Sequence, residues 1–571
     1  MSTDKLSPVE GIKVESRYLR GTLARELKEE TDQFEKESIQ LLKFHGSYQQ
    51  DDRDSRAKTR GEGSGKSFSM MLRSRIPGGL MTSAQLLEHL DLCDQVGNAT
   101  MKLTTRQAIQ LHGILKGDLK KTIRRIHDVG LSTLAACGDV NRNVMCCPAK
   151  RTSGVHQEIQ RLTHTLAMEL APRTKAYHEL WLTDDATGSE ELVAGAQEHD
   201  VVEPLYGRTY LPRKFKMAVG LPDDNCVDMY TQDISFMAIV RDGTIVGYNV
   251  LVGGGLGTTP SAAKTFPALA KRMAMVRPEQ VVDVSKAIIS VQRDHGNRED
   301  RKRARMKYLV HDWGIEKFRQ TVEQYYGKPL DDCARDDVTG FDDHMGWQAQ
   351  GDGLWSYGLN IENGRLYDNE QRQLKQALRQ VAAEFAPEIR LTTHQSLIFC
   401  DFREEDRSRL ETILEAHHVR LSEQTSTVRR WSMACVALPT CGLAITESER
   451  ALPGIIDEIE GPLARLGLDK DAFTIRMTGC PNGCARPYNA DIGIVGKAKG
   501  KYTLFMGGAL LGYRLGYIYK DLVSHETLVG EIVAVFAAYK VNRLEGESLG
   551  DFCARVGRDE LENLAAIAPQ P

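Results

Sequence analysis

Four cysteines near the C-terminal end of the chain fall into two closely spaced pairs. Five residues separate Cys435 from Cys441, and three residues separate Cys480 from Cys484. Thiolates at such spacings can converge on one metal centre, because each short loop bends two sulfurs toward a common point. The segment 479–483 contains two glycines and a proline, which are residue types that favour the necessary turn. The pattern therefore predicts a four-thiolate metal site.

Two kinds of metal centre suit four thiolates, a structural zinc ion and an iron–sulfur cluster. Zinc ligands are usually separated by about two to four residues, so the interval between Cys435 and Cys441 favours the cluster. A third interpretation is four buried cysteines that bind nothing, since free cysteine is often buried. Their grouping around glycine and proline turns favours a metal site over that interpretation.

A second group of chemically active residues is cationic. Lys214 and Lys216 lead into an apolar segment that we expect to be a strand, so both side chains project from one face. Two adjacent ammonium groups repel each other unless an anion lies between them. The alternative is an exposed edge strand that uses lysine to prevent aggregation. Further basic side chains alternate with apolar residues between positions 67 and 115, namely Arg73, Arg75, Lys102, Arg106 and His112.

Two other segments carry weaker signals. The glycines at 253–257 could hold a phosphate or carboxylate through their backbone N–H groups. The charge run 298–307 is interpreted as the solvated face of a helix within a helical region at 278–325.

Hydrophobic patterning divides the chain into units. Residues 1–60 are polar and charged, and we expect an arm that wraps another surface. Residues 67–115 predict strand, turn, helix and strand, followed by an amphipathic helix at 118–135. A helix is expected at 155–170, and residues 184–200 form a polar excursion. The segment 234–252 predicts a hairpin.

The second half of the chain repeats the first. The sequence Leu-Thr-Thr-Arg-Gln at 103–107 returns as Leu-Thr-Thr-His-Gln at 391–395, and Lys216-Met217 is echoed by Arg476-Met477. We therefore expect an α/β fold with mixed α+β character and an internal pseudo-two-fold. The expected units are the arm, a ferredoxin-like pair formed by 61–140 with 345–420, a first α/β module at 141–344 carrying the substrate cations, and a second at 421–571 carrying the cysteines.

Composition limits the possible functions. The chain has 571 residues and a formal net charge of -4, which does not call for a nucleic-acid partner. No run approaches the roughly 18 apolar residues of a membrane span, and the N-terminus has no apolar signal region. Twelve cysteines in so long a chain are not a disulfide scaffold. We therefore expect a cytoplasmic protein.

The cysteine pattern resembles the cluster-binding signature of the sirohaem-containing sulfite and nitrite reductases. The resemblance extends over nearly the whole chain and is closest to the sulfite reductase haemoprotein (beta) subunits. It is carried by the motifs YLRGT, YQQDDRD, LRSRIPGG, LTTRQ, NRNVM, PRTKAYHELWL, YLPRKFK and TGCPNGC. It implies a three-domain α/β fold around a central cofactor junction.

The resemblance also implies roles for individual residues. The [4Fe-4S] ligands would be Cys435, Cys441, Cys480 and Cys484, and Cys484 would also bridge to the sirohaem iron. The substrate oxyanion would contact Arg73, Arg142, Lys214 and Lys216, with Arg75 as the alternative to Arg73. Sirohaem would lie against Arg106, Gln110 and His112, with Lys102 meeting one of its carboxylates, and Asn482 would lie beside the cluster. Lys102 departs from relatives that carry arginine there, which weakens a bidentate contact.

The implied reaction is the six-electron reduction of sulfite to sulfide in sulfur assimilation. Nothing in the sequence resembles a flavin or nicotinamide domain, so electrons would come from a separate flavoprotein (NADPH) subunit or, alternatively, from ferredoxin. A sirohaem nitrite reductase is the nearer alternative, and the NRNVM and PRKFK stretches favour sulfite. A zinc-stabilised protein without enzymatic activity is the distant alternative.

Overall fold

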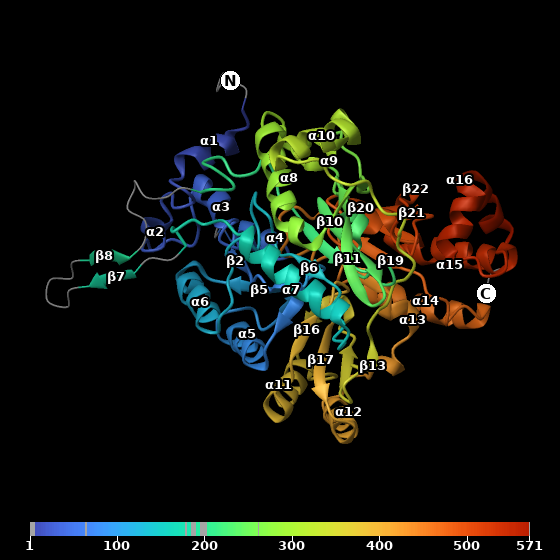
Figure 1. The fold of residues 1–571 in the computed structure, drawn as a ribbon. Coiled ribbons are helices and arrows are strands. Elements are labelled where there is room, and N and C mark those ends of the chain that lie inside the picture. The colour runs from blue at the N-terminus through green and yellow to red at the C-terminus, as the bar shows by residue number, and fades with distance from the viewer. Residues whose placement is uncertain are drawn as a thin grey trace.

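Four five-stranded sheets organise the part of the chain that the structure describes, which is residues 6–62, 65–177, 180–183, 190–194, 203–260 and 262–569 of a computed structural model (Figure 1). Helices cover these sheets, which confirms the α/β class. The expected polar excursion at 184–200 lies outside the described residues except for 190–194, which form β8 (Glu190–Ala194). It pairs with β7 (Leu180–Thr183) in a separate two-stranded sheet.

The two smaller sheets repeat one another and exchange one edge strand. The first has the order β1 (Ser47–Asp51), β2 (Phe68–Arg73), β5 (Ile109–Ile114), β4 (Met101–Leu103) and β15 (Arg365–Leu366). The second has the order β13 (Gly346–Ala349), β14 (Trp355–Leu359), β17 (Leu397–Phe402), β16 (Ile389–Leu391) and β3 (Leu80–Met81). Each edge strand β3 and β15 thus belongs to the sheet of the other half.

A left-handed residue permits each exchange. Gly78 has φ 60° in the turn before β3, and Asn363 has φ 52° in the turn before β15. Glycine and asparagine are the residues that adopt this conformation most readily. Helices α5 (Ser83–Gln95), α6 (Lys116–Asp128), α11 (Leu374–Phe385) and α12 (Arg407–Ala416) belong to these two units. Helix α6 ends seven residues before the predicted end at 135, because Val129 leaves helical geometry and Gly130 has φ 77°.

The two larger sheets also share one topology. The first consists of β6 (Met145–Cys146), β9 (Met217–Gly220), β10 (Ile234–Arg241), β11 (Thr244–Val252) and β12 (Lys271–Val276). The second consists of β18 (Ser432–Ala434), β19 (Ile475–Thr478), β20 (Ile492–Ala498), β21 (Lys501–Met506) and β22 (Tyr517–Ser524). In each sheet the first three strands are parallel and the last three are antiparallel. The predicted internal repeat is therefore confirmed.

Different helices cover the two larger sheets. The first has α7 (Gly154–Glu169), α8 (Val281–His295), α9 (Met306–Trp313) and α10 (Ile315–Tyr326), and the second has α13 (Thr427–Arg430), α14 (Leu452–Leu466), α15 (His525–Asn542) and α16 (Leu549–Ile567). The predicted helical region at 278–325 contains α8, α9 and α10, but residues 296–305 between α8 and α9 contain only the short 3-10 turn η5 (Arg301–Arg303).

The N-terminal arm is anchored by apolar side chains. It carries α1 (Pro8–Glu15), α2 (Leu23–Glu26), α3 (Lys36–Leu42) and, beyond β1, α4 (Arg56–Gly61). Leu19, Phe34 and Leu41 are buried in the same core as the first smaller sheet. Farther along, Arg53 donates to the backbone oxygens of Cys441 and Ala444, so the arm reaches the cysteine-bearing loop.

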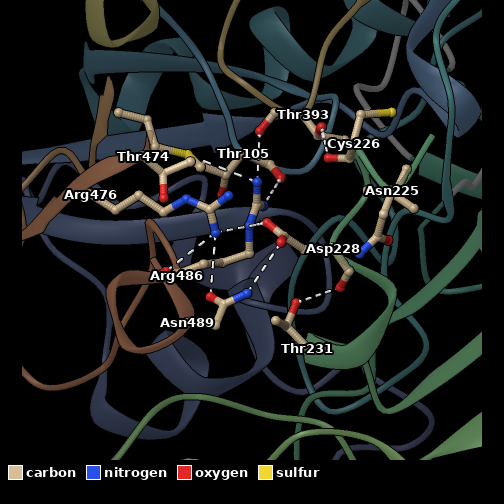
Figure 2. A network of polar contacts seen from close by, with 12 residues as sticks. Thr105, Asn225, Cys226, Asp228, Thr231, Thr393, Thr474, Arg476, Arg486 and Asn489 are labelled. Atoms are coloured by element: carbon tan, nitrogen blue, oxygen red, sulfur yellow. Dashed lines mark hydrogen bonds and ion pairs between the residues drawn. The ribbon is translucent and has the colours of Figure 1, made fainter. Parts of the chain in front are cut away.

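A buried ionic network joins the four units at their centre (Figure 2). Asp228 Oδ2 lies 2.5 Å from Arg486 Nε and 2.9 Å from Arg476 Nη1. Arg486 also donates to the backbone oxygens of Thr105 and Thr393, which are the matching threonines of the repeated turn. Asp228 is fully buried and both arginines are nearly so. One carboxylate therefore holds two guanidinium groups, and through Arg486 it fixes both smaller units.

We predict that Asp228→Asn destabilises the protein strongly. The substitution removes the negative charge between two buried guanidinium groups, and breaking a buried ion pair in this way costs about 3–5 kcal/mol. The measurement is the apparent unfolding midpoint of the holoprotein by circular dichroism at a fixed heating rate. Asp559→Asn on the exposed face of α16 is the matched control and should leave the midpoint unchanged. Equal midpoints for the two variants would contradict the role of the network.

Candidate cluster and anion site

The cysteine pairs emerge from neighbouring strands. Strands β18 and β19 run parallel, with Ala434 opposite Met477, so both end at the same edge of the sheet. Cys435 follows β18 directly, and Cys480 stands two residues after β19. The loops that continue from these ends carry Cys441 and Cys484. The parallel register therefore brings together two pairs that are 38 residues apart at their closest point (442 to 479).

Close backbone packing holds the two cysteine loops against each other. Ile445 and Thr446 donate their N–H groups to the backbone oxygen of Gly479, and the Gly479 N–H points to Cys435 Sγ at 3.4 Å. A Cβ at Gly479 would lie 2.4 Å from the Thr446 oxygen, so only glycine fits. Asn482 Nδ2 lies 3.5 Å from Cys480 Sγ, which places Asn482 beside the cysteine group.

The four thiols form one electrostatic group. Burial, followed by the proximity of Cys484, raises the pKa of Cys435, Cys441 and Cys480, with that of Cys480 reaching about 12. Such an effect arises where burial disfavours the thiolate and where like charges would lie close together. A multivalent cation offsets both penalties by binding the thiolates. The all-sulfur donor set fits a [4Fe-4S] cluster.

A cavity that is partly open to solvent adjoins this group. Its lining brings together residues from three of the four units, namely Thr105, Arg106, Lys214, Lys216, Thr231, Gln232, Gly255, Leu256, Gly257, Arg305, Asn482, Gly483, Cys484 and Arg486. Cys484 is the one member of the cysteine group in this lining, and it is exposed there. Cys484 therefore faces both the other thiols and the cavity.

The paired lysines line this cavity, and they lead directly into a strand, as predicted. Strand β9 begins only at Met217, and Phe215 forms an isolated bridge to Asn141. Burial, followed by the charge of Arg213, lowers the pKa of Lys214 to about 7, and burial followed by Arg106 lowers the pKa of Lys216. Edge-strand protection therefore does not explain these lysines, whereas a bound anion would relieve the crowding of their positive charges.

Two buried cations at this site belong to the charge run that the sequence pattern suggested to be solvated. The interpretation of 298–307 as a solvated helix face is wrong for Arg305 and Lys307, which are buried. Arg305 lines the cavity and forms a two-pronged ion pair with Asp233, whose Oδ2 lies 2.7 Å from Arg305 Nη2. Lys307 donates to the backbone oxygens of Gly255 and Gly257 at 2.9 Å. Lys307 therefore holds the glycine turn in place by occupying its carbonyls.

The only sequence signal for these two residues was the Asp233-Ile234 repeat of Asp491-Ile492. A buried Asp233 requires a cation, but the sequence does not show which one. In the other half Asp491 is bonded to Thr474 and the Gly550 N–H instead.

Arg73 and Arg142 lie in one polar cluster next to the cavity lining. Both guanidinium groups lie close to the hydroxyl of the half-buried Tyr48, and Arg73 Nη1 lies 2.9 Å from Cys137 Sγ. Gln110 turns its amide oxygen to Arg73 and accepts from Nε at 3.0 Å. Arg75, in contrast, donates to the Ala167 backbone oxygen at the end of α7. The structure thus brings Arg73 rather than Arg75 toward Arg142.

Arg106 lines the cavity, whereas His112 of β5 is not part of its lining. Arg106 donates to the backbone oxygens of Asn143 and Met217 at 3.1 and 3.2 Å and to the Gln232 side chain. His112 is buried with Nδ1 3.3 Å from Gln50 Oε1, and burial lowers its pKa well below the usual range. His112 is therefore neutral, whereas Arg106 presents a fixed cation to the cavity.

Lys102 has a carboxylate partner within the chain. Its ammonium is buried and lies 2.5 Å from Glu449 Oε2, with further contacts to the Asn363 and Ala434 backbone oxygens. It is absent from the cavity lining. Glu449 also pairs with Arg365, the strand partner of Lys102, so Lys102 supports the strand exchange. Its contact with a sirohaem carboxylate stays a prediction.

Two domain families match parts of this chain. Residues 62–129 and 348–417 match the nitrite/sulfite reductase ferredoxin-like half domain, which covers the two smaller units. Residues 163–330 match the nitrite and sulphite reductase 4Fe-4S domain. The second match falls on the first larger module, whereas the four cysteines lie in the second, whose topology is the same. None of the described helices is long and apolar enough to cross a membrane.

Similar proteins extend the match to nearly the full length. The chain is 43% identical to a sulfite reductase [NADPH] hemoprotein beta-component of Staphylococcus haemolyticus, over 97% of this chain and 95% of that protein. It is 44% identical to a sulfite reductase [ferredoxin] of Synechococcus elongatus, over 98% and 91%. The solved structure of the Mycobacterium tuberculosis NirA protein superposes with a TM-score of 0.77 at 26% identity, over 96% and 95%. The chain belongs to the nitrite and sulphite reductase family.

Proposed function

We propose that the chain is the haemoprotein of an assimilatory sulfite reductase, which reduces sulfite to sulfide with six electrons at a sirohaem coupled to a [4Fe-4S] cluster. One observation carries the proposal: Cys484 belongs to the four-thiol group and also lines the cavity that contains Lys214 and Lys216. A thiolate in this position can connect a cluster to a second iron centre beside an anion site. The sulfite reductases named above support sulfite rather than nitrite as the substrate.

The cofactors would be held by separate parts of the site. Cys435, Cys441, Cys480 and Cys484 would ligate the cluster, with Asn482 beside it. Arg106, Gln110 and His112 would lie against the sirohaem. When bound, these groups supply the electrons and the iron that binds sulfur.

The cations would act on the substrate itself. Lys214 and Lys216, together with Arg73 and Arg142, would bind the oxyanion and orient it. Ammonium and guanidinium donors strengthen the polarisation of sulfur–oxygen bonds. Each oxygen leaves as water, so protons must arrive at the same place. Because burial lowers the pKa of Lys214 to about 7, its ammonium is a suitable proton donor.

Electrons would come from another protein. We propose a flavoprotein that accepts them from NADPH, with ferredoxin as the alternative donor. The YLRGTLA and YQQDDRDSRA stretches of the arm support the first choice, and relatives of both kinds are known. We also place the protein in the cytoplasm, where its twelve cysteines would stay reduced.

The purified protein is expected to show the optical and EPR spectra of sirohaem and a [4Fe-4S] cluster. Sulfite added under reducing conditions should shift the haem bands, because the substrate binds next to the cations. Iron analysis should give about five irons per chain, four from the cluster and one from the haem. A colourless protein that contains zinc in place of iron would overturn the proposed function.

We predict that Cys484→Ser removes both cofactors. The substitution deletes a cluster ligand and the thiolate that faces the cavity. Iron content and the haem absorption band are the measurements. Cys553→Ser, which alters a buried cysteine of α16 remote from the thiol group, is the control and should retain both. An unchanged haem and cluster spectrum in Cys484→Ser would refute the bridging position.

We predict that Lys216→Met and Lys214→Met each spare the cofactors but slow sulfite reduction. Loss of one charged donor to an oxyanion typically lowers the rate by about 10²–10³-fold. The measurement is kcat/KM for sulfite with NADPH and the flavoprotein subunit, and in parallel with reduced ferredoxin. Lys121→Met on exposed α6 is the control. Wild-type turnover with intact spectra in both variants would show that the lysine pair has no role in catalysis.

A further inference from the structure

A second group of metal-ligating side chains lies away from the cation cavity. Cys147, Asp224, Cys226 and His344 each offer one ligand atom, and these atoms all lie within 4.8 Å of one another. All four residues are buried, and Asp224 is the most accessible at 8%. None of them belongs to the four-thiol group described above. We call this set the Cys147 group.

The distances in the Cys147 group suit a single ion. Cys147 Sγ lies 2.9 Å from Asp224 Oδ2 and 3.9 Å from His344 Nε2. His344 Nε2 lies 3.1 Å from Asp224 Oδ2, and the Cys226 thiol contacts that of Cys147. A tetrahedral zinc ion, with bonds of about 2.0 Å to nitrogen or oxygen and 2.3 Å to sulfur, holds its ligand atoms about 3.3–3.8 Å apart. Shifts of well under 1 Å would convert the three measured contacts into that arrangement.

The surrounding groups orient the ligand atoms toward a common point. Asp224 Oδ1 accepts from the N–H groups of Cys226 and Asp342, at 3.1 and 3.2 Å, so Oδ2 is the oxygen that faces the Cys147 and His344 side chains. His344 Nδ1 has no hydrogen bond but faces the Asp342 carboxylate at 3.6 Å. A carboxylate behind a histidine is the usual outer partner of a metal-bound imidazole, because it fixes the ring and strengthens it as a ligand.

The internal repeat relates the Cys147 group to the cluster cysteines. Cys147 follows β6 directly, as Cys435 follows β18. Cys226 and Cys484 also match, since each stands two residues before the left-handed residue that precedes a short 3-10 helix, η3 (Met229–Thr231) or η9 (Pro487–Asn489). Their backbone oxygens accept from the matching hydroxyls of the repeated turns. The other two ligands are a carboxylate and an imidazole, so this half offers a mixed donor set.

We propose that Cys147, Asp224, Cys226 and His344 bind one structural Zn²⁺ ion. Two sulfurs, one nitrogen and one oxygen make a closed four-coordinate set, which is typical of zinc rather than of an iron–sulfur cluster. The ion would join three distant segments, the end of β6, the loop before η3 and the connector that leads into β13. Metal binding of this kind contributes directly to folding. The proposal is independent of the proposed function.

The wild-type holoenzyme provides the first test. Protein produced with zinc in the medium is dialysed against EDTA to remove surface ions, and crystals are measured on both sides of the zinc absorption edge. We expect a zinc anomalous peak about 2.0–2.3 Å from the four ligand atoms and about one zinc per chain by mass spectrometry. No zinc at these ligands, whether zinc is missing altogether or bound elsewhere, would overturn the proposal.

Variants provide the second test. Cys226→Ser and His344→Gln should each reduce the zinc content from about one ion to below about 0.1 per chain, because losing a ligand weakens binding steeply. Cys146→Ala is the matched control, since this neighbouring buried cysteine points toward Gly78 and not into the group. It should keep its zinc. Full zinc content in both ligand variants would overturn the proposal, and if they fail to fold, the wild-type anomalous map decides.

Discussion

The contact between Asp228 and Arg486 is the interaction on which the junction of the four units depends. The two residues occupy matching positions in the two halves, since each has positive φ and precedes a short 3-10 helix. A residue that meets its own counterpart across a two-fold axis would face an identical side chain, and like charges there would repel. In this chain the two positions carry opposite charges, so the same place becomes an attractive buried pair.

This ion pair also connects the cavity to the two smaller units. Arg486 lines the anion cavity and at the same time binds the backbone oxygens of Thr105 and Thr393. Thr105 in turn donates its hydroxyl to the Cys484 backbone oxygen at 3.1 Å. The Cys484 loop, the cation cavity and the repeated turns therefore share one framework, and a change in the packing of either half would displace the groups that line the cavity.

The two halves use their equivalent positions differently. On one side Arg106 and Lys216 face an open cavity. In the second half the matching residues are His394 and Arg476, and Arg476 forms an ion pair with Asp228. Aromatic rings of Phe341 and Trp431 pack around His394, and burial lowers its pKa to about 3, which keeps it neutral. One half therefore keeps an anion site, and the other is filled by apolar packing and an internal ion pair.

The sequence by itself determined the four-thiol group, the repeat and the crowded lysines, because spacing, turn residues and short motifs are local properties. It could not determine the roles of Arg305, Lys307 and Lys102. Each of these cations has its partner far along the chain, a buried carboxylate or a set of backbone oxygens. The charge pattern suggested solvent for Arg305 and Lys307, whereas the family resemblance suggested a cofactor carboxylate for Lys102. The sequence also did not predict the exchange of strands β3 and β15, because each strand pairs with a segment that is distant in the sequence. Only tertiary packing decides which charges are buried together, since the cost of burying a charge depends on the partner that the fold supplies.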